Sequence, residues 1–172
     1  IIKSMKKKFM QTGMFFLLVS LLLLTGSFSD SDFMDWDYIP VFMKRADLEN
    51  SVSYRQTARE IENSGKIYYK PPYIFMNERY KGVHIINNSD PYHPVNEGFI
   101  TAPGCIDMAV KGSIMYLDNA VDLVAIDLDS KQVTKRIKNV FPESVSPSNK
   151  AYYGHNSDEY VIVGWTENLN KK

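Results

Sequence analysis

The chain is poor in cysteine and has no excess of charge of either sign, and both absences exclude classes of protein. Cys105 is the single cysteine among 172 residues, so no intramolecular disulfide framework can replace a hydrophobic core. Twenty basic residues balance twenty acidic ones, so the positive excess that favours nucleic-acid binding is missing, and we predict no nucleic-acid partner. Hydrophobic residues make up 44% of the chain, as in ordinary globular proteins.

Motifs for catalysis and metal binding are lacking as well. His84, His93 and His155 stand apart from one another, without the spacing of a zinc site. Cys105 has no neighbouring base to activate it, so we expect a small buried residue. The sequence contains no Gly-x-Ser-x-Gly elbow and no glycine-rich phosphate loop. We therefore predict no catalytic residues, no metal site and no cofactor.

One long hydrophobic run is present, near the amino terminus. Lysines at positions 6–8 precede an uncharged core of 11 residues from Met14 to Leu24, and small residues follow at Thr25, Gly26 and Ser27. This order predicts a secretory signal peptide within residues 1–29. A membrane-spanning helix needs about 20 apolar residues, and the run is marginal for that length. An uncleaved anchor, with membrane association through this segment, is the alternative.

The end of the signal resembles the lipobox of bacterial lipoproteins. The family pattern ends in a cysteine whose thiol accepts the lipid, whereas Leu23–Ser27 ends in Ser27, whose hydroxyl is a weaker nucleophile. The resemblance therefore supports export but not lipidation. Loss of residues 1–26 removes four lysines and no acidic residue, so twenty acidic and sixteen basic residues leave a net charge of −4.

The next segment, residues 30–64, is predicted to contain an extended arm and a helix. Aromatic residues around Pro40 indicate an arm that packs onto the domain. Residues 46–63 are the only good helix candidate, with Asp47 as a start signal and the sequence at 63–65 as a left-handed end. Two short helical pieces are the alternative to one helix.

From Lys66 onward the hydrophobic period is two, which predicts short strands. Turn residues separate these strands, and no helical segment lies between them, so we expect an antiparallel meander. The predicted strands are 66–70, 73–77, 83–87, 95–101, 106–111, 114–118, 123–128 and 132–140, with a further strand group at 160–165.

Two stretches of this region repeat each other. Tyr73–Asn77 matches Ile114–Asp118 at an offset of 41, and His84–Asn87 matches Val124–Asp127 at an offset of 40. Four short strands repeating at about 40 residues are typical of propeller blades. Residues 83–91 and 123–127 also resemble LVIVD repeats, which occur in β-propeller proteins of bacterial cell envelopes, many of them lipoproteins of the Bacteroidetes type. The resemblance covers residues 65–141.

We therefore predict an all-β fold for residues 65–172, with about two antiparallel four-stranded blades that form an incomplete propeller. Closed propellers usually have about four to eight blades. Open blade edges invite pairing, which predicts self-association through them. A truncated fragment without independent function is the alternative, and it predicts poor solubility and protease sensitivity from Lys66 onward. The resemblance implies a location in the cell envelope, at the outer membrane, in the periplasm or at the cell surface.

The leading function is a non-catalytic binding or scaffold role for an unknown protein or glycan. The candidate binding loops are residues 78–82, 88–94 and 118–122, because loops on rigid β frames carry function.

The rival function is that of an envelope hydrolase or lyase. It predicts a concave pocket that holds at least two acidic residues within about 10 Å. The candidates are Asp107, Asp118, Asp122 and Asp127. Asp127 and Asp129 share one side of a strand, but we expect them to bond turn amides rather than a metal ion.

Overall fold

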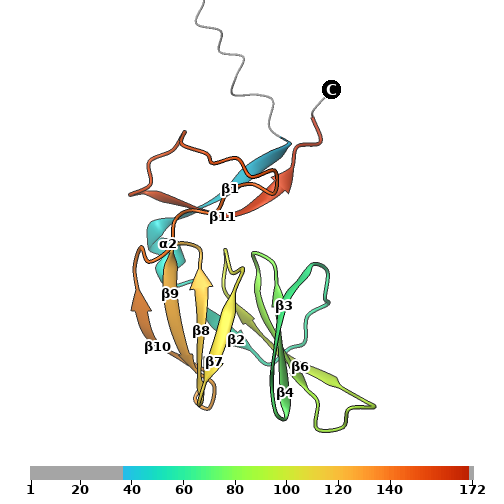
Figure 1. Cartoon of the computed structure of the whole chain (residues 1–172). Helices are drawn as coiled ribbons and strands as arrows, with labels where there is room; N and C mark the ends of the chain where they lie inside the picture. Colours follow the sequence, from blue (N-terminus) through green and yellow to red (C-terminus); the bar gives the residue numbers. More distant parts are fainter. Residues whose placement is uncertain (1–36, 171–172) are drawn as a thin grey trace, which may run out of the picture. The chain divides into compact units, whose positions relative to one another are not determined.

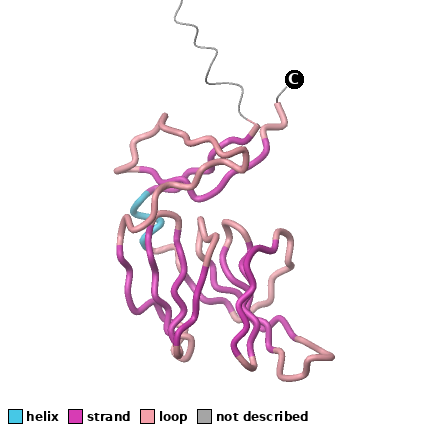
Figure 2. Tube along the Cα trace, viewed as in Figure 1, coloured by secondary structure: helices cyan, strands magenta, loops and turns pink. Residues whose placement is uncertain are grey.

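The computed structural model describes residues 37–170, and strands dominate this part of the chain. The predicted signal peptide and Ser27 lie outside the described residues. Figure 1 labels the elements and Figure 2 shows their types. In chain order they are β1 (Tyr38–Lys44), α2 (Arg45–Glu49), β2 (Ser53–Arg55), β3 (Ser64–Lys70), β4 (Tyr73–Glu78), β5 (Gly82–Asn87), β6 (Val95–Thr101), β7 (Met108–Lys111), β8 (Ile114–Asn119), β9 (Asp122–Asp127), β10 (Gln132–Ile137) and β11 (Tyr160–Glu167).

Two antiparallel sheets carry the repeat that the sequence predicts. The first blade is β3, β4, β5 and β6 in spatial order, with β2 added to the outer edge of β6. The second blade is β7, β8, β9 and β10 in the same order. The turns between the second and third strands repeat a left-handed residue, Tyr80 at φ 63° and Ala120 at φ 56°. The predicted all-β fold of about two antiparallel blades is confirmed, and the first blade has a fifth strand.

The helix predicted over residues 46–63 is wrong for most of its length. Helix α2 ends at Glu49, and residues 53–55 form strand β2. Tyr54 in that strand pairs with Ile100 of β6. An open sheet edge offers this segment backbone hydrogen bonds and tertiary packing, whereas a short helix alone is marginal in water. Ser64 begins β3, so the predicted left-handed helix end is absent.

The core lies between the two blades. Phe75 and Ile85 of the first blade share one hydrophobic cluster with Met115 and Leu117 of the second, and each of these four side chains is at most 4% exposed. A single sheet has no second layer of its own, so each blade depends on its neighbour to exclude water from this face. Mutual coverage by the blades is therefore the main source of hydrophobic stabilisation.

Strands β1 and β11 form a separate two-stranded ribbon that joins distant parts of the sequence. Tyr38 pairs with Glu167 at one end, and Lys44 pairs with Tyr160 at the other. Val161 and Val163 of β11 belong to a second hydrophobic cluster with Leu48 of α2 and Val121 of the β8–β9 turn. The predicted strand group at residues 160–165 is confirmed, and its partner is β1.

Candidate functional site

The four acidic candidates fall into different settings. Asp122 and Asp127 lie at opposite ends of β9. Asp107 and Asp118 line the same groove on the second blade. Of the four acids in the rival prediction, Asp107 and Asp118 therefore share one groove, and the other two have separate roles.

Asp122 is fully buried and is held by two arginines. Its carboxylate accepts hydrogen bonds from Nη2 of Arg45 at 2.7 and 2.9 Å and from Nη1 of Arg136 at 2.8 Å. The backbone amide of Asn139 adds a bond of 3.0 Å. Burial acts to raise the pKa of Asp122, but the hydrogen bonds from Arg45, Asn139 and Arg136 outweigh it, and the pKa lies below its usual range. The carboxylate therefore stays charged and joins α2 and β10 to β9.

A carboxylate at the end of the second strand fixes the incoming connection in each blade. Asp118 accepts hydrogen bonds from the amides of residues 106–107 at 2.8 and 2.9 Å. Glu78 accepts from the amides of residues 62–63 at 3.2 and 2.6 Å. Bonds from backbone amides to a carboxylate are charge-assisted and strong. Both acids therefore position the start of the first strand of their blade.

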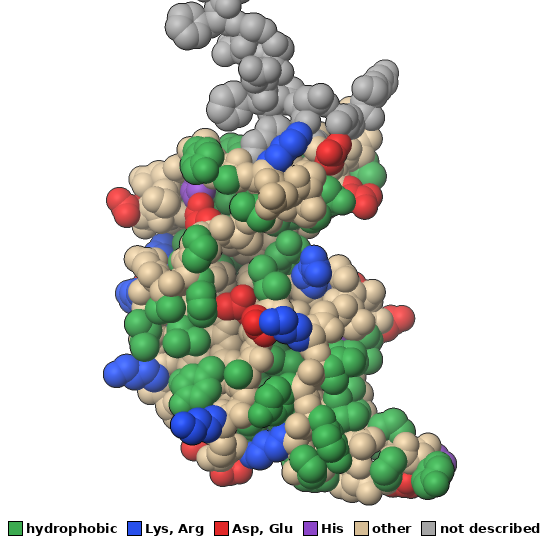
Figure 3. All heavy atoms as spheres, viewed as in Figure 1, with side chains coloured by type: hydrophobic (Ala, Val, Ile, Leu, Met, Phe, Trp, Pro, Cys, Tyr) green, Lys and Arg blue, Asp and Glu red, His purple; other side chains and the backbone are tan. Residues whose placement is uncertain are grey.

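The groove that contains Asp107 and Asp118 lies on the outward face of the second blade and has a volume of about 460 Å³. Its floor is apolar, with Tyr116 on β8 and Leu123 on β9, and residues 141–144 form one side. Figure 3 looks onto the second blade and shows hydrophobic side chains over its strands. Burial raises the pKa of Asp118 despite its amide bonds. The groove thus combines apolar surface with a carboxyl group that protonates more readily than usual.

Asp127 has the turn role that the sequence predicts. Its Oδ1 accepts hydrogen bonds from the amides of Asp129 at 2.8 Å and Ser130 at 3.1 Å. Within residues 37–170 no group of three or more His, Cys, Asp or Glu side chains is arranged to hold a metal ion. The prediction for Asp127 as a turn residue is confirmed.

His84 is a packed residue of the first blade. It lies in β5, is fully buried, and places Nε2 at 3.1 Å from Glu78 Oε2. Its ring also packs edge-on against the ring of Phe99, with 4.8 Å between the two ring centroids. His84 therefore completes the bonding of Glu78 and supports the same connection.

The other two histidines and the cysteine have local partners. His93 lies 2.8 Å from Asp90 in the exposed 88–94 loop, and His155 lies 2.9 Å from Glu143. Cys105 is fully buried, and its burial raises the pKa of the thiol well above the usual value. A buried thiol that resists ionisation is a poor nucleophile, so the prediction of a small buried residue is confirmed.

The three loops predicted to bind a ligand differ in exposure. The 118–122 loop is covered, because Asn119 and Asp122 are fully buried and Val121 packs with α2 and β11. The 78–82 loop approaches β11, where a Cβ built on Gly164 would lie 3.3 Å from the Cβ of Tyr80. The 88–94 loop joins β5 to β6 and projects from the blade (Figure 1), and Tyr92 within it is 90% exposed. It is the one of the three loops that offers an open surface.

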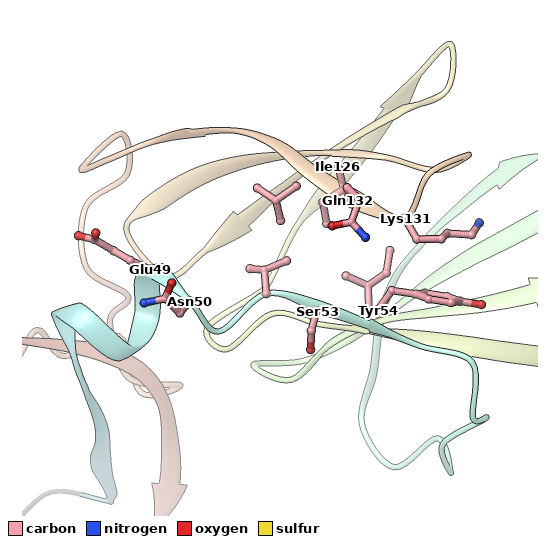
Figure 4. A pocket seen from close by; sticks show the side chains of 10 residues that line it. Glu49, Asn50, Ser53, Tyr54, Ile126, Lys131 and Gln132 are labelled. Carbon is pink, nitrogen blue, oxygen red and sulfur yellow. The ribbon is translucent and has the colours of Figure 1, made fainter.

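A second cavity, the inter-blade cleft, lies between β2 and β10 and has a volume of about 450 Å³. Figure 4 shows Glu49 and Asn50 at one end of it and Lys131 with Tyr54 at the other. The Nζ atom of Lys131 is 5.4 Å from the centroid of the Tyr54 ring, a cation–π contact. Gln132 also lines the cleft. This lining suits a neutral or mixed-charge ligand and contains no pair of carboxylates.

Sequence reasoning missed Glu78, Arg45 and Arg136. The paired registers of β4 and β5 bring Glu78 to His84, six residues away, and Arg45 reaches Asp122 across 77 residues. One signal was available: Asn77-Glu78 and Asp118-Asn119 occupy equivalent places before the turn in the two repeats. Polar residues at such repeated strand ends indicate a repeated structural bond.

Among residues 37–170 the helix found is far too short to cross a membrane. Comparison with known proteins adds no assignment: no protein family, no curated protein and no solved structure matches this chain.

Proposed function

We propose that the chain is an exported protein of the bacterial cell envelope that binds a protein or a glycan and acts as a scaffold without catalysing a reaction. The three-part segment at residues 1–29 supports export. The resemblance of residues 83–91 and 123–127 to LVIVD repeats supports the envelope location. A β frame of paired blades supports binding through its loops.

The 88–94 loop carries the proposed binding role. Tyr92 stands between Pro91 and His93-Pro94 and exposes nearly its whole ring. The loop is shaped before any ligand arrives, because the amide of Ser89 donates to Asn87 Oδ1 at 2.9 Å and the amide of Tyr92 donates to Asp90 Oδ1 at 3.0 Å. An aromatic ring on a preorganised loop binds sugar faces or protein pockets at low entropic cost.

The carboxylates support a role without catalysis. Asp122 is saturated by arginines and Asp127 by turn amides. A general acid or base must exchange a proton with a substrate, which side chains bound in this way are poorly placed to do. The binding role therefore uses the loop and leaves these acids to hold the fold.

Co-sedimentation tests the proposal. The full chain is mixed with purified peptidoglycan sacculi and, separately, with outer-membrane vesicles, and the bound fraction is measured. We expect binding to one of the two, and a loss of about tenfold or more in affinity for Tyr92→Ala, since truncation of an aromatic hot spot costs ~2 kcal/mol or more and ~1.4 kcal/mol is a factor of ten. Tyr153→Ala is the matched control, because Tyr153 is 88% exposed and lies outside the loop. Equal binding by wild type and Tyr92→Ala, or no binding to either fraction, contradicts the proposal.

An envelope hydrolase or lyase is the second candidate, and the groove of Asp107 and Asp118 favours it. Asp118 has a raised pKa, as a general acid needs, and Asp107 lines the same groove. This candidate expects the chain to release soluble sugars or peptides from the same two fractions, and Asp118→Asn to abolish the release. An inactive wild-type chain rules it out.

A further inference from the structure

The outward face of the second blade matches a face that is buried in the first blade. Phe75 of β4 and Ile85 of β5 lie in the core and are at most 4% exposed. Their equivalents in the repeat are Tyr116 at an offset of 41 and Ala125 at an offset of 40. Tyr116 is 39% exposed and pairs on the outward face with Ala125, a small residue that is 8% exposed. The second blade therefore presents to solvent the face that its repeat uses to bind a neighbouring blade.

The converse holds for the first blade. Met108 and Val110 of β7 belong to the second blade's side of the inter-blade contact, and each is 8% exposed. Their equivalents at an offset of 41 are Ile67 and Tyr69 of β3, which are 65% and 58% exposed. Exposed apolar residues grouped on one strand face are typical of interaction surfaces. The two open faces thus correspond to the two halves of the contact that is already formed within the chain.

We propose that the outward face of the second blade packs against the outward face of the first blade of a second molecule of this chain. The contact is head-to-tail and repeats the one that joins the two blades within a molecule. Head-to-tail contacts close into rings when the rotation permits. Two to four molecules would supply roughly the four to eight blades of closed propellers. The inference goes beyond the proposed function and does not depend on the 88–94 loop.

Charge supports this pairing of faces. Within the chain, Lys66 at the start of β3 forms an ion pair with Asp107 before β7. These two residues are equivalents of each other at an offset of 41. In a head-to-tail contact, Asp107 of one molecule would therefore face Lys66 of the next, so the charges alternate instead of repelling. A contact between two second-blade faces would bring Asp107 of one molecule toward Asp107 of the other.

The open areas also lie on equivalent strands of the two blades. On the first blade, Arg59, in the connection between β2 and β3, covers the part of the face at β6, with its guanidinium carbon 5.3 Å from the centroid of the Phe99 ring. The inner strand β3 remains exposed through Ile67 and Tyr69. On the second blade, residues 141–144 form one side of the groove, and its floor includes the inner strands β7 and β8. Both free surfaces therefore include the first strand of their blade, β3 or β7. These two strands are adjacent in the existing contact, where Tyr68 Oη donates to Val110 O at 2.8 Å.

Size-exclusion chromatography with light scattering tests the contact on the full chain in one mild detergent. We expect a protein mass of two to four chains for wild type. Ile67→Asp and Tyr116→Asp should each reduce this mass, because each places a charge on one of the two faces. An equimolar mixture of these variants should recover dimers, because each variant keeps one intact face.

Tyr153→Asp is the matched control and should keep the wild-type mass, since Tyr153 is exposed and lies on neither face. Circular dichroism checks that the variants fold, which we expect from the exposure of the replaced side chains. A wild-type chain that is monomeric at about 100 µM overturns the proposal. A variant at either face that keeps the wild-type mass, or a mixture that stays monomeric, also overturns it.

Discussion

Replacement of Asp122 by alanine should cost a large part of the stability of the fold. Asp122 is fully buried, and Arg45 and Arg136, its two partners, have side chains only 15% and 12% exposed. Asp122→Ala leaves two largely buried positive charges beside each other, and the one counter-charge left to them is that of Glu49, at 3.4 Å from Nε of Arg45. Breaking a buried pair in this way typically costs about 3–5 kcal/mol. Domains of this size are stable by only about 5–15 kcal/mol, so the loss is severe.

Urea unfolding followed by circular dichroism measures this effect. With a slope of about 2 kcal/mol per molar, a loss of about 4 kcal/mol lowers the urea midpoint by about 2 M. Asp127→Ala is the matched control at the other end of β9, where the carboxylate bonds only turn amides. It should cost about 1 kcal/mol, as a lost capping bond does.

The refuting result is an Asp122→Ala midpoint no lower than that of Asp127→Ala. In that case the two arginines find water or other partners, and the network does not hold α2 and β10 to β9. A second variant, Asp122→Asn, keeps the volume and removes the charge. It should fall between wild type and Asp122→Ala, because the amide oxygen can still accept one hydrogen bond.

Two further predictions concern the first blade. Burial acts to raise the pKa of Glu78, but the hydrogen bonds from Asn63, His84 and Glu62 outweigh it, so the folded pKa is lowered. The stability that Glu78 contributes is therefore present above the unfolded carboxyl pKa and is lost as the pH falls through the lower folded pKa. Over that acidic range the urea midpoint of Glu78→Gln should fall less than that of the wild type. Gly82 has φ 144°, and a Cβ there would lie 1.9 Å from the carbonyl oxygen of Ile100. The melting temperature of Gly82→Ala should therefore lie at least several degrees below that of the control Gly112→Ala, whose Cβ meets nothing within 4 Å. Equal pH profiles for Glu78→Gln and wild type, or equal melting temperatures for the two glycine variants, would show the reasoning to be wrong.

The strands were predictable because their signal is local. Alternation such as buried Met115, exposed Tyr116 and buried Leu117 is written directly in the sequence and fixes which face of a strand packs. The repeat adds a second, independent signal, because residues at offsets of 40 and 41 occupy the same positions in the registers of their strands. Hence all eight strands of the two blades were predicted within about four residues at their ends.

The errors come from partners that are distant in the sequence. Residues 53–55 become a strand only because β6 has an open edge, and no local pattern announces that edge. The same holds for the 118–122 loop, which was predicted to bind a ligand but lies under β11, about 40 residues later in the chain. Local composition records exposure on average, whereas the fold decides which loop a distant strand covers.

The register of the β1–β11 ribbon has a mechanical consequence. Tyr38 and Glu167 are paired, so the chain enters and leaves the described fold at the same end of one antiparallel ladder. A pull on the chain before Tyr38 and after Glu167 therefore opens the ladder one residue pair at a time, as a zipper opens, and reaches Lys44 and Tyr160 last. Tension on the two ends of the described fold would thus be released by peeling of this ribbon, while the hydrophobic contact between the blades stays closed.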